Sequence, residues 1–115
     1  MERSKRVKSK EDFQKVISSK QKIYSDAFVI YYLKRKEYDY SRFGIAASKK
    51  MGGAVIRVRI RRQVRSMLRE INLQSILQPM DYVIIVRKPY EQNDYRTNLQ
   101  ELKKMFTKFG GQMSE

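Results

Sequence analysis

The sequence predicts an α+β fold, a single-domain α-β sandwich in which helices pack on one small sheet. Short β-branched and aromatic runs alternate with longer amphipathic segments in the order helix, strand, strand, helix, strand, helix. The chain has 115 residues, 41% of them hydrophobic, which suits one domain with one core. We therefore expect one domain over residues 1–115, with loose segments at 1–8 and 110–115, and we leave one extra short strand open.

The first half of the chain supplies one helix and two strands. Ser9, followed by two acidic residues and then by apolar residues at helical spacing, predicts a helix over residues 10–19. The run "AFVIYYLK" at 27–34 is β-branched and aromatic, and it predicts the first strand. The run "RFGIAAS" at 42–48 predicts the second strand, whose small side chains would let a helix approach closely.

The second half supplies a helix, a strand and a helix. When residues 55–72 are wound into a helix of 3.6 residues per turn, the apolar residues fall on one arc that would pack on the sheet. They are Ile56, Ile60, Val64, Met67, Leu68 and Ile71. The run "DYVIIVRK" at 81–88 predicts the third strand, which Pro89 stops. A stripe of leucines and phenylalanines predicts the last helix over residues 94–109.

The composition limits what the chain can do chemically. Twenty-six Lys and Arg against twelve Asp and Glu give a net charge of +14, which favours a polyanionic partner such as nucleic acid or an anionic membrane surface. The chain has no His and no Cys, which excludes Ser–His and Cys–His catalytic centres. Its carboxylates are scattered, so we expect no active site and no metal site within the protein. No apolar run is long enough to span a membrane, and we expect a cytoplasmic location.

Positive charge is concentrated on the helix predicted at 55–72. Five arginines occupy an arc of about 140° beside the apolar one, namely Arg57, Arg61, Arg62, Arg65 and Arg69. A solvated charged face would explain mixed charges, but these arginines have no matching acids, and like charges at i, i+4 oppose helix formation. The pattern favours anion binding, because guanidinium groups suit phosphate geometry. Lys49 and Lys50, next to two glycines and the helix start, are either a solubilising pair or phosphate contacts, and we favour contacts.

Four blocks of the sequence resemble the protein component of bacterial ribonuclease P, over nearly the whole chain. They are "EDFQKV" at 11–16, "FVIYY" at 28–32, "RFGIAASKKMGGAVIRVRIRRQVR" at 42–65 and "DYVIIVRK" at 81–88. The resemblance implies a fold like domain 2 of ribosomal protein S5, in which a left-handed crossover joins two parallel strands. General rules would favour a right-handed crossover.

The resemblance also implies a function. Proteins of this family have no catalytic residues, because a large RNA uses Mg²⁺ to remove the 5′ leader of precursor tRNA. The implied partners are that RNA, bound 1:1, and the precursor tRNA. The implied RNA-binding residues are Lys49, Lys50, Arg57, Arg61, Arg62, Arg65 and Arg69. The implied leader cleft, between the first helix and the sheet, includes Phe13, Ile17 and Tyr31, with Arg6, Lys8 and Lys10 at its rim.

Three points stay open on the sequence alone. Phe13 fits the apolar stripe of its helix, so it is either a core residue or a stacking platform for an unpaired base. Gly53 and Val58 stand where the family has asparagine, and Val58 lies within the arginine arc. An RNA-binding protein of ribosomal or chaperone-like type, without a nuclease role, is the alternative function. An independent metal-dependent nuclease would need clustered carboxylates.

Overall fold

The computed structural model describes residues 6–7, 9–34, 40–71 and 80–113, with only the backbone described at 110–113. It contains one four-stranded sheet in the order β1-β2-β4-β3 and three α-helices. The elements are α1 (Lys10–Ser18), β1 (Lys22–Tyr24), β2 (Phe28–Leu33), β3 (Arg42–Ala47), the 3₁₀ turn η2 (Lys49–Met51), α2 (Ala54–Glu70), β4 (Asp81–Val86), the 3₁₀ turn η4 (Lys88–Gln92) and α3 (Tyr95–Met113).

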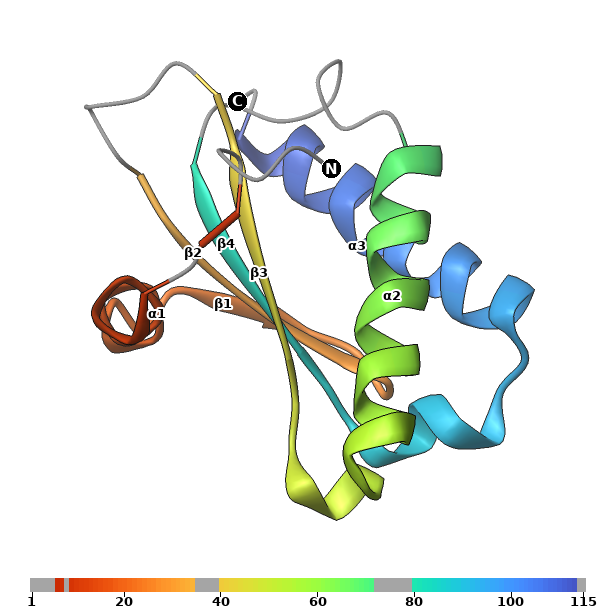
Figure 1. Ribbon diagram of the computed structural model, residues 1–115. Coiled ribbons are helices and arrows are strands. Elements are labelled where there is room, and N and C mark those ends of the chain that lie inside the picture. The colour runs from red at the N-terminus through yellow and green to blue at the C-terminus, as the bar shows by residue number, and fades with distance from the viewer. Residues whose placement is uncertain (1–5, 8, 35–39, 72–79, 114–115) are drawn as a thin grey trace.

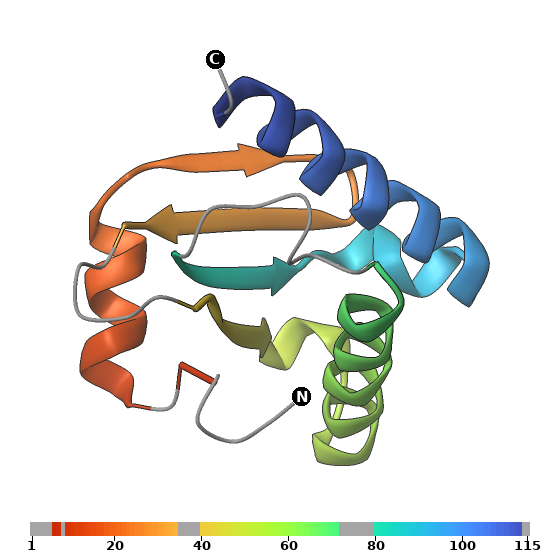
Figure 2. The same ribbon diagram turned by 90° about the horizontal axis from the view of Figure 1, so that it is seen from above.

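The molecule has three layers. α1 lies on one face of the sheet, and α2 and α3 lie together on the other (Figures 1 and 2). β1 pairs with β2 and β2 with β4 in antiparallel fashion, whereas β3 and β4 are parallel. The chain descends β3, returns up α2 and descends β4, which lies behind β3 in Figure 1. This path is a left-handed crossover, so the fold class, with the crossover that the resemblance implied, is confirmed.

The main core fills the space between the sheet and the two helices α2 and α3. The ring of Tyr82 stacks on that of Phe43, with 5.3 Å between centroids, and meets the edge of Phe106 at 5.8 Å. All three side chains are buried. Burial of aromatic and branched side chains contributes about 1.5–3 kcal/mol each, so this side of the sheet holds α2 in place.

α1 is fastened to the sheet at both ends. The hydroxyl of Ser9 accepts a hydrogen bond from the backbone N–H of Asp12 at 3.0 Å, which caps the helix as the sequence predicted. At the other end, the hydroxyl of Ser19 donates to the carbonyl of Tyr32 on β2 at 3.0 Å. Val16 is fully buried between these two ends.

The structure corrects several expected boundaries. β1 is the extra strand that the sequence left open. α3 continues to Met113, beyond the expected end of the helix at residue 109. Arg6, which lies within the first segment expected to be loose, forms a parallel bridge with Phe43. Ile56 was expected in the core but is 37% exposed, and its side chain lies against Gly52, just before the helix.

Candidate nucleic-acid interface

The arginines of α2 form one surface along the helix, which we call the α2 arginine surface: Arg57, Arg61, Arg62, Arg65 and Arg69. The neighbouring face of the helix is anchored by four buried residues, Ile60, Val64, Met67 and Leu68. Three of the five arginines are half-buried and two are exposed. The packing of the apolar face thus fixes which way the guanidinium groups project, as the helical periodicity predicted.

The α2 arginine surface has no internal neutralisation among the described residues. The ion pairs between described residues join Arg42 to acids and include none of these five arginines. Burial, and then the like charges of Arg6, Arg61 and Arg62, lower the pKa of Arg65. The Nε of Arg57 is buried without a hydrogen-bond partner. An anion would supply the missing counter-charge and acceptors.

The N-terminus of α2 adds two lysines and a glycine turn. Lys49 and Lys50 are exposed on η2, directly before the helix. Gly52 has φ 131°, and a Cβ there would lie 2.8 Å from Cδ1 of Ile56, so only glycine fits. Gly53 is the N-cap and offers no side-chain hydrogen bond to the free N–H groups of the first turn. These groups and the lysines together suit a phosphate.

Val58 lies on the solvent side of α2. It is 42% exposed, and Val55 one turn before it is 84% exposed. Neither residue belongs to the core. Arg59 does not belong to the α2 arginine surface, and its charge acts against the rise that burial causes in the pKa of the Tyr90 hydroxyl.

On the other face of the sheet, Phe13 of α1 lies directly over Gly44 of β3. A Cβ built on Gly44 would be 2.6 Å from Cζ of Phe13 and 2.9 Å from Cε2. The prediction that small residues in this strand admit a helix is therefore confirmed. Phe13 remains only half-buried. Its ring thus packs on the sheet and still offers part of its surface to a ligand.

Phe13 belongs to a group of partly exposed residues on α1 and on the sheet. We call this group the α1-side surface: Phe13, Ile17, Val29, Tyr31, Ala46 and Ile85. Val29 and Ala46 both pair with Ile85, so these three form a row across the sheet. The Nζ of Lys22 lies 5.6 Å from the centroid of the Tyr31 ring, a cation–π distance. Lys10 is exposed at the start of α1. The surface combines aromatic groups with nearby positive charge.

Comparisons with known proteins agree with this geometry. The family model described as Ribonuclease P matches residues 1–110. The chain is 43% identical to the ribonuclease P protein component of Streptococcus agalactiae serotype Ia over 96 residues, 84% of this chain and 85% of that protein. It is 37% identical to the protein component of Geobacillus kaustophilus over 111 residues, 96% of this chain and 91% of that protein.

The chain belongs to the ribonuclease P protein family. Its role is that of a protein component of this endoribonuclease in tRNA processing. The fold is also similar to the Staphylococcus aureus RNase P protein, with TM-score 0.78 and 30% identity over 91% of this chain and 94% of that one. The Thermotoga maritima RNase P protein has TM-score 0.79 and 29% identity over 90% of this chain and 96% of that one.

The structure separates the site residues that family resemblance implied. Phe13, Ile17 and Tyr31 come together on the α1-side surface, with Lys10 at the start of the same helix. Arg6 lies instead on the outer edge of β3, where it bridges Phe43, and its charge adds to burial in lowering the pKa of Arg65. Lys8 falls outside the described residues. The binding roles of all these residues remain predictions.

Sequence reasoning missed a buried ion pair beneath α1. Asp81 accepts two hydrogen bonds from Arg42, from Nε at 2.8 Å and from Nη2 at 2.6 Å. Both residues are at least 93% buried, and Asp12 of α1 lies 3.5 Å from the same guanidinium. The sequence contains one indication of this pair, because each of the two strands begins with a charged residue. The pair ties α1 to the floor of the α1-side surface.

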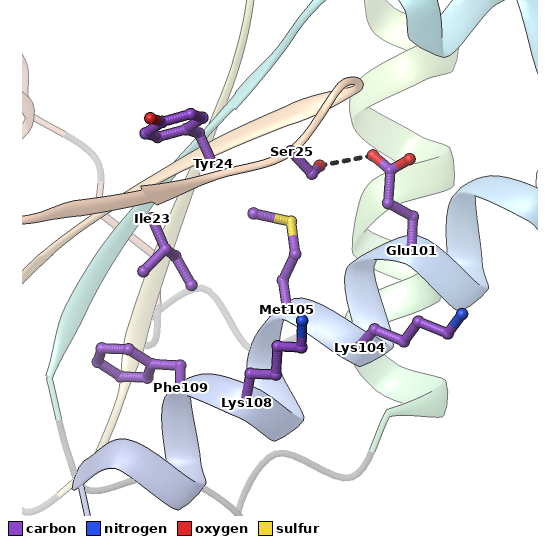
Figure 3. Close-up of a pocket in the computed structure, with 8 residues that line it drawn as sticks. All are labelled: Ile23, Tyr24, Ser25, Glu101, Lys104, Met105, Lys108 and Phe109. Atoms are coloured by element: carbon purple, nitrogen blue, oxygen red, sulfur yellow. Dashed lines mark hydrogen bonds between the residues drawn. The ribbon is translucent and has the colours of Figure 1, made fainter.

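A pocket of about 300 Å³ lies between β1 and α3, at the opposite edge of the sheet from β3 (Figure 3). Ile23, Met105 and Phe109 line its apolar part, and Lys104 and Lys108 also line it. The hydroxyl of Ser25 donates to Glu101 at 2.6 Å, which ties the β1–β2 turn to α3. The sequence assigned no role to this region.

Two features that would indicate other functions are absent from the described residues. No three carboxylates among them lie together in a way that could hold a metal ion. None of the helices in the described part of the chain is both long and apolar enough to cross a membrane.

Proposed function

We propose that the α2 arginine surface docks on the RNA subunit of ribonuclease P in a 1:1 complex. The observation that carries this proposal is the row of five arginines without acidic partners among the described residues. Such a row binds a phosphate backbone in a sequence-independent way, and arginine forks can each contact two phosphate oxygens. Lys49 and Lys50 extend the same surface around the start of α2.

The α1-side surface holds the single-stranded 5′ leader of precursor tRNA. Unpaired bases stack on aromatic rings, with a gain of about 1–3 kcal/mol per base. Phe13 and Tyr31 supply such rings, and Lys10 and Lys22 supply nearby charge. Ile17, where the family often has an aromatic residue, provides apolar contact without stacking.

The RNA subunit carries out the cleavage, and the Mg²⁺ ions that it needs are bound by RNA. The whole chain lacks His and Cys, so it lacks the usual general base and the thiolate nucleophile. The described carboxylates fit no metal ion. The protein contributes binding and orientation of the leader, and the phosphodiester is hydrolysed outside it.

The salt dependence of RNA binding tests the docking surface. If the five arginines each neutralise one phosphate, log K for a bacterial ribonuclease P RNA should fall against log salt with a slope of about −3.5 to −4.5. Arg61→Ala should make the slope shallower by roughly 1, whereas Arg96→Ala, on the exposed start of α3, should not. A flat dependence, or equal effects of the two substitutions, would show that the α2 arginine surface is merely solvated.

A further inference from the structure

Arg6 and Val7 are held on the outer edge of the sheet. Arg6 forms a parallel bridge with Phe43, and the backbone N–H of Val7 donates to the carbonyl of Phe43 at 3.0 Å. β3 is the edge strand of the sheet and the strand on which α2 packs. The short segment therefore extends the sheet on the side of the arginine helix (Figure 2).

The two side chains of this segment have different surroundings. Val7 is 4% exposed, so it is anchored in the protein. Val7 is not part of the core between the sheet and the helices α2 and α3. Since successive side chains of an extended segment point to opposite faces, Arg6 points to the face on which α2 packs, in keeping with the effect of its charge on Arg65. The Nε of Arg6 is buried and has no hydrogen-bond partner.

Arg61, Arg62 and Arg65 are neighbours on α2, and Arg6 is held beside β3, the strand on which α2 packs. We call these four residues the edge cluster. No acid among the described residues forms an ion pair with any of them. Neighbouring like charges destabilise the free protein. A buried Nε without an acceptor adds to that cost, and Arg6 is held there by its backbone bridge.

We infer that the edge cluster is a phosphate-binding site for the RNA subunit, in which Arg6 of the edge segment and Arg65 of α2 share one phosphate group. The inference rests on the proposed function of α2. A phosphate supplies the counter-charge that the cluster lacks and oxygen acceptors for several guanidinium forks. Arg6 is then a docking residue for the RNA subunit and does not belong to the rim of the leader surface.

Binding of a bacterial ribonuclease P RNA to the full-length protein tests the site. Arg6→Ala and Arg65→Ala should each weaken binding about tenfold, the effect of losing one charge-assisted hydrogen bond. The double variant should lose less than the product of the two, because both side chains act on one phosphate. Arg96→Ala is the control of equal charge and should change binding by less than about twofold.

The outcomes separate this inference from the function on which it rests. If Arg6→Ala behaves like Arg96→Ala while Arg65→Ala weakens binding, the edge cluster does not include Arg6 and the inference fails. If neither Arg6→Ala nor Arg65→Ala weakens binding, the docking function of α2 fails as well. Strictly multiplicative effects of Arg6→Ala and Arg65→Ala would also overturn a shared phosphate.

Two further measurements exclude other roles for Arg6. Without RNA, Arg6→Ala should leave the thermal midpoint unchanged or raise it, because a like charge is removed; a lower midpoint would make Arg6 a structural residue of the sheet edge. In the reconstituted holoenzyme, Arg6→Ala should leave unchanged the ratio between the affinities for precursor tRNA and for mature tRNA. A reduced preference would return Arg6 to the leader surface and overturn the inference.

Discussion

Replacing Asp81 by alanine should destabilise the protein more than removal of any exposed charge. The substitution deletes both hydrogen bonds to Arg42, of 2.8 and 2.6 Å, and leaves a guanidinium that is 7% exposed. Removing one partner of a buried pair costs about 3–5 kcal/mol, because the other charge stays desolvated. Asp12, 3.5 Å from Arg42, offsets part of that loss. We therefore expect about 3 kcal/mol less free energy of unfolding.

Urea unfolding followed by circular dichroism measures this quantity. The matched control is the double variant Arg42→Met with Asp81→Leu, which removes both charges and keeps similar volume. It should lose less free energy of unfolding than Asp81→Ala alone, since no buried charge is left unpaired. A loss below about 1 kcal/mol for Asp81→Ala, or a larger loss for the double variant, would refute the reasoning.

Four further predictions follow from named contacts. Gly44→Ala should force the Phe13 ring off β3 and lower the free energy of unfolding by about 1–3 kcal/mol. It should also lower the affinity of the holoenzyme for precursor tRNA that carries a leader. An unchanged free energy of unfolding in urea, together with an unchanged precursor affinity, would contradict the contact between Phe13 and Gly44. Gly53→Asn should raise the free energy of unfolding by a few tenths of a kcal/mol. A Cβ at this position would meet nothing within 4 Å, and the N-cap of α2 now lacks a side-chain acceptor. A lower thermal midpoint for Gly53→Asn would contradict this prediction. Burial raises the pKa of Tyr90 to about 12. Because the folded state then keeps the hydroxyl proton to a higher pH than the unfolded state, the free energy of unfolding should fall by about 1.4 kcal/mol per pH unit between about pH 10 and pH 12. Tyr90→Phe should remove this component from urea curves measured over that range, and identical pH dependence of the two proteins would contradict it. Val58→Asn should tighten binding of the RNA subunit and leave precursor affinity unchanged, whereas an equal or weaker RNA affinity would show that Val58 replaces no polar contact.

Periodicity predicted the elements that carry the site. The 3.6-residue repeat identified the buried face of α2 and therefore the side on which its arginines project. It also placed Ile56 on the buried face, whereas this residue of the first turn is 37% exposed. The left-handed crossover came from the resemblance, because general packing rules favour the other hand.

Long-range juxtapositions were less accessible from the sequence. Arg42 and Asp81 are 39 positions apart, and pairing them requires the register of β3 on β4. Arg6 stands close in sequence to Lys8 and Lys10, which suggested one shared rim. Side chains alternate between the two faces of an extended segment, and this alternation directs Arg6 toward α2. The bridge to Phe43, which shows that the segment is extended along β3, cannot be read from the sequence.

Reconstitution of cleavage tests most directly the claim that this chain binds and orients while RNA breaks the bond. The purified protein is mixed with a bacterial ribonuclease P RNA and a precursor tRNA at low Mg²⁺, and the products are separated by size. The account predicts a 5′ leader released by a single cut, only when the RNA is present, and faster with the protein than without it. Cleavage by the protein alone would contradict it, and so would an RNA whose activity the protein does not stimulate.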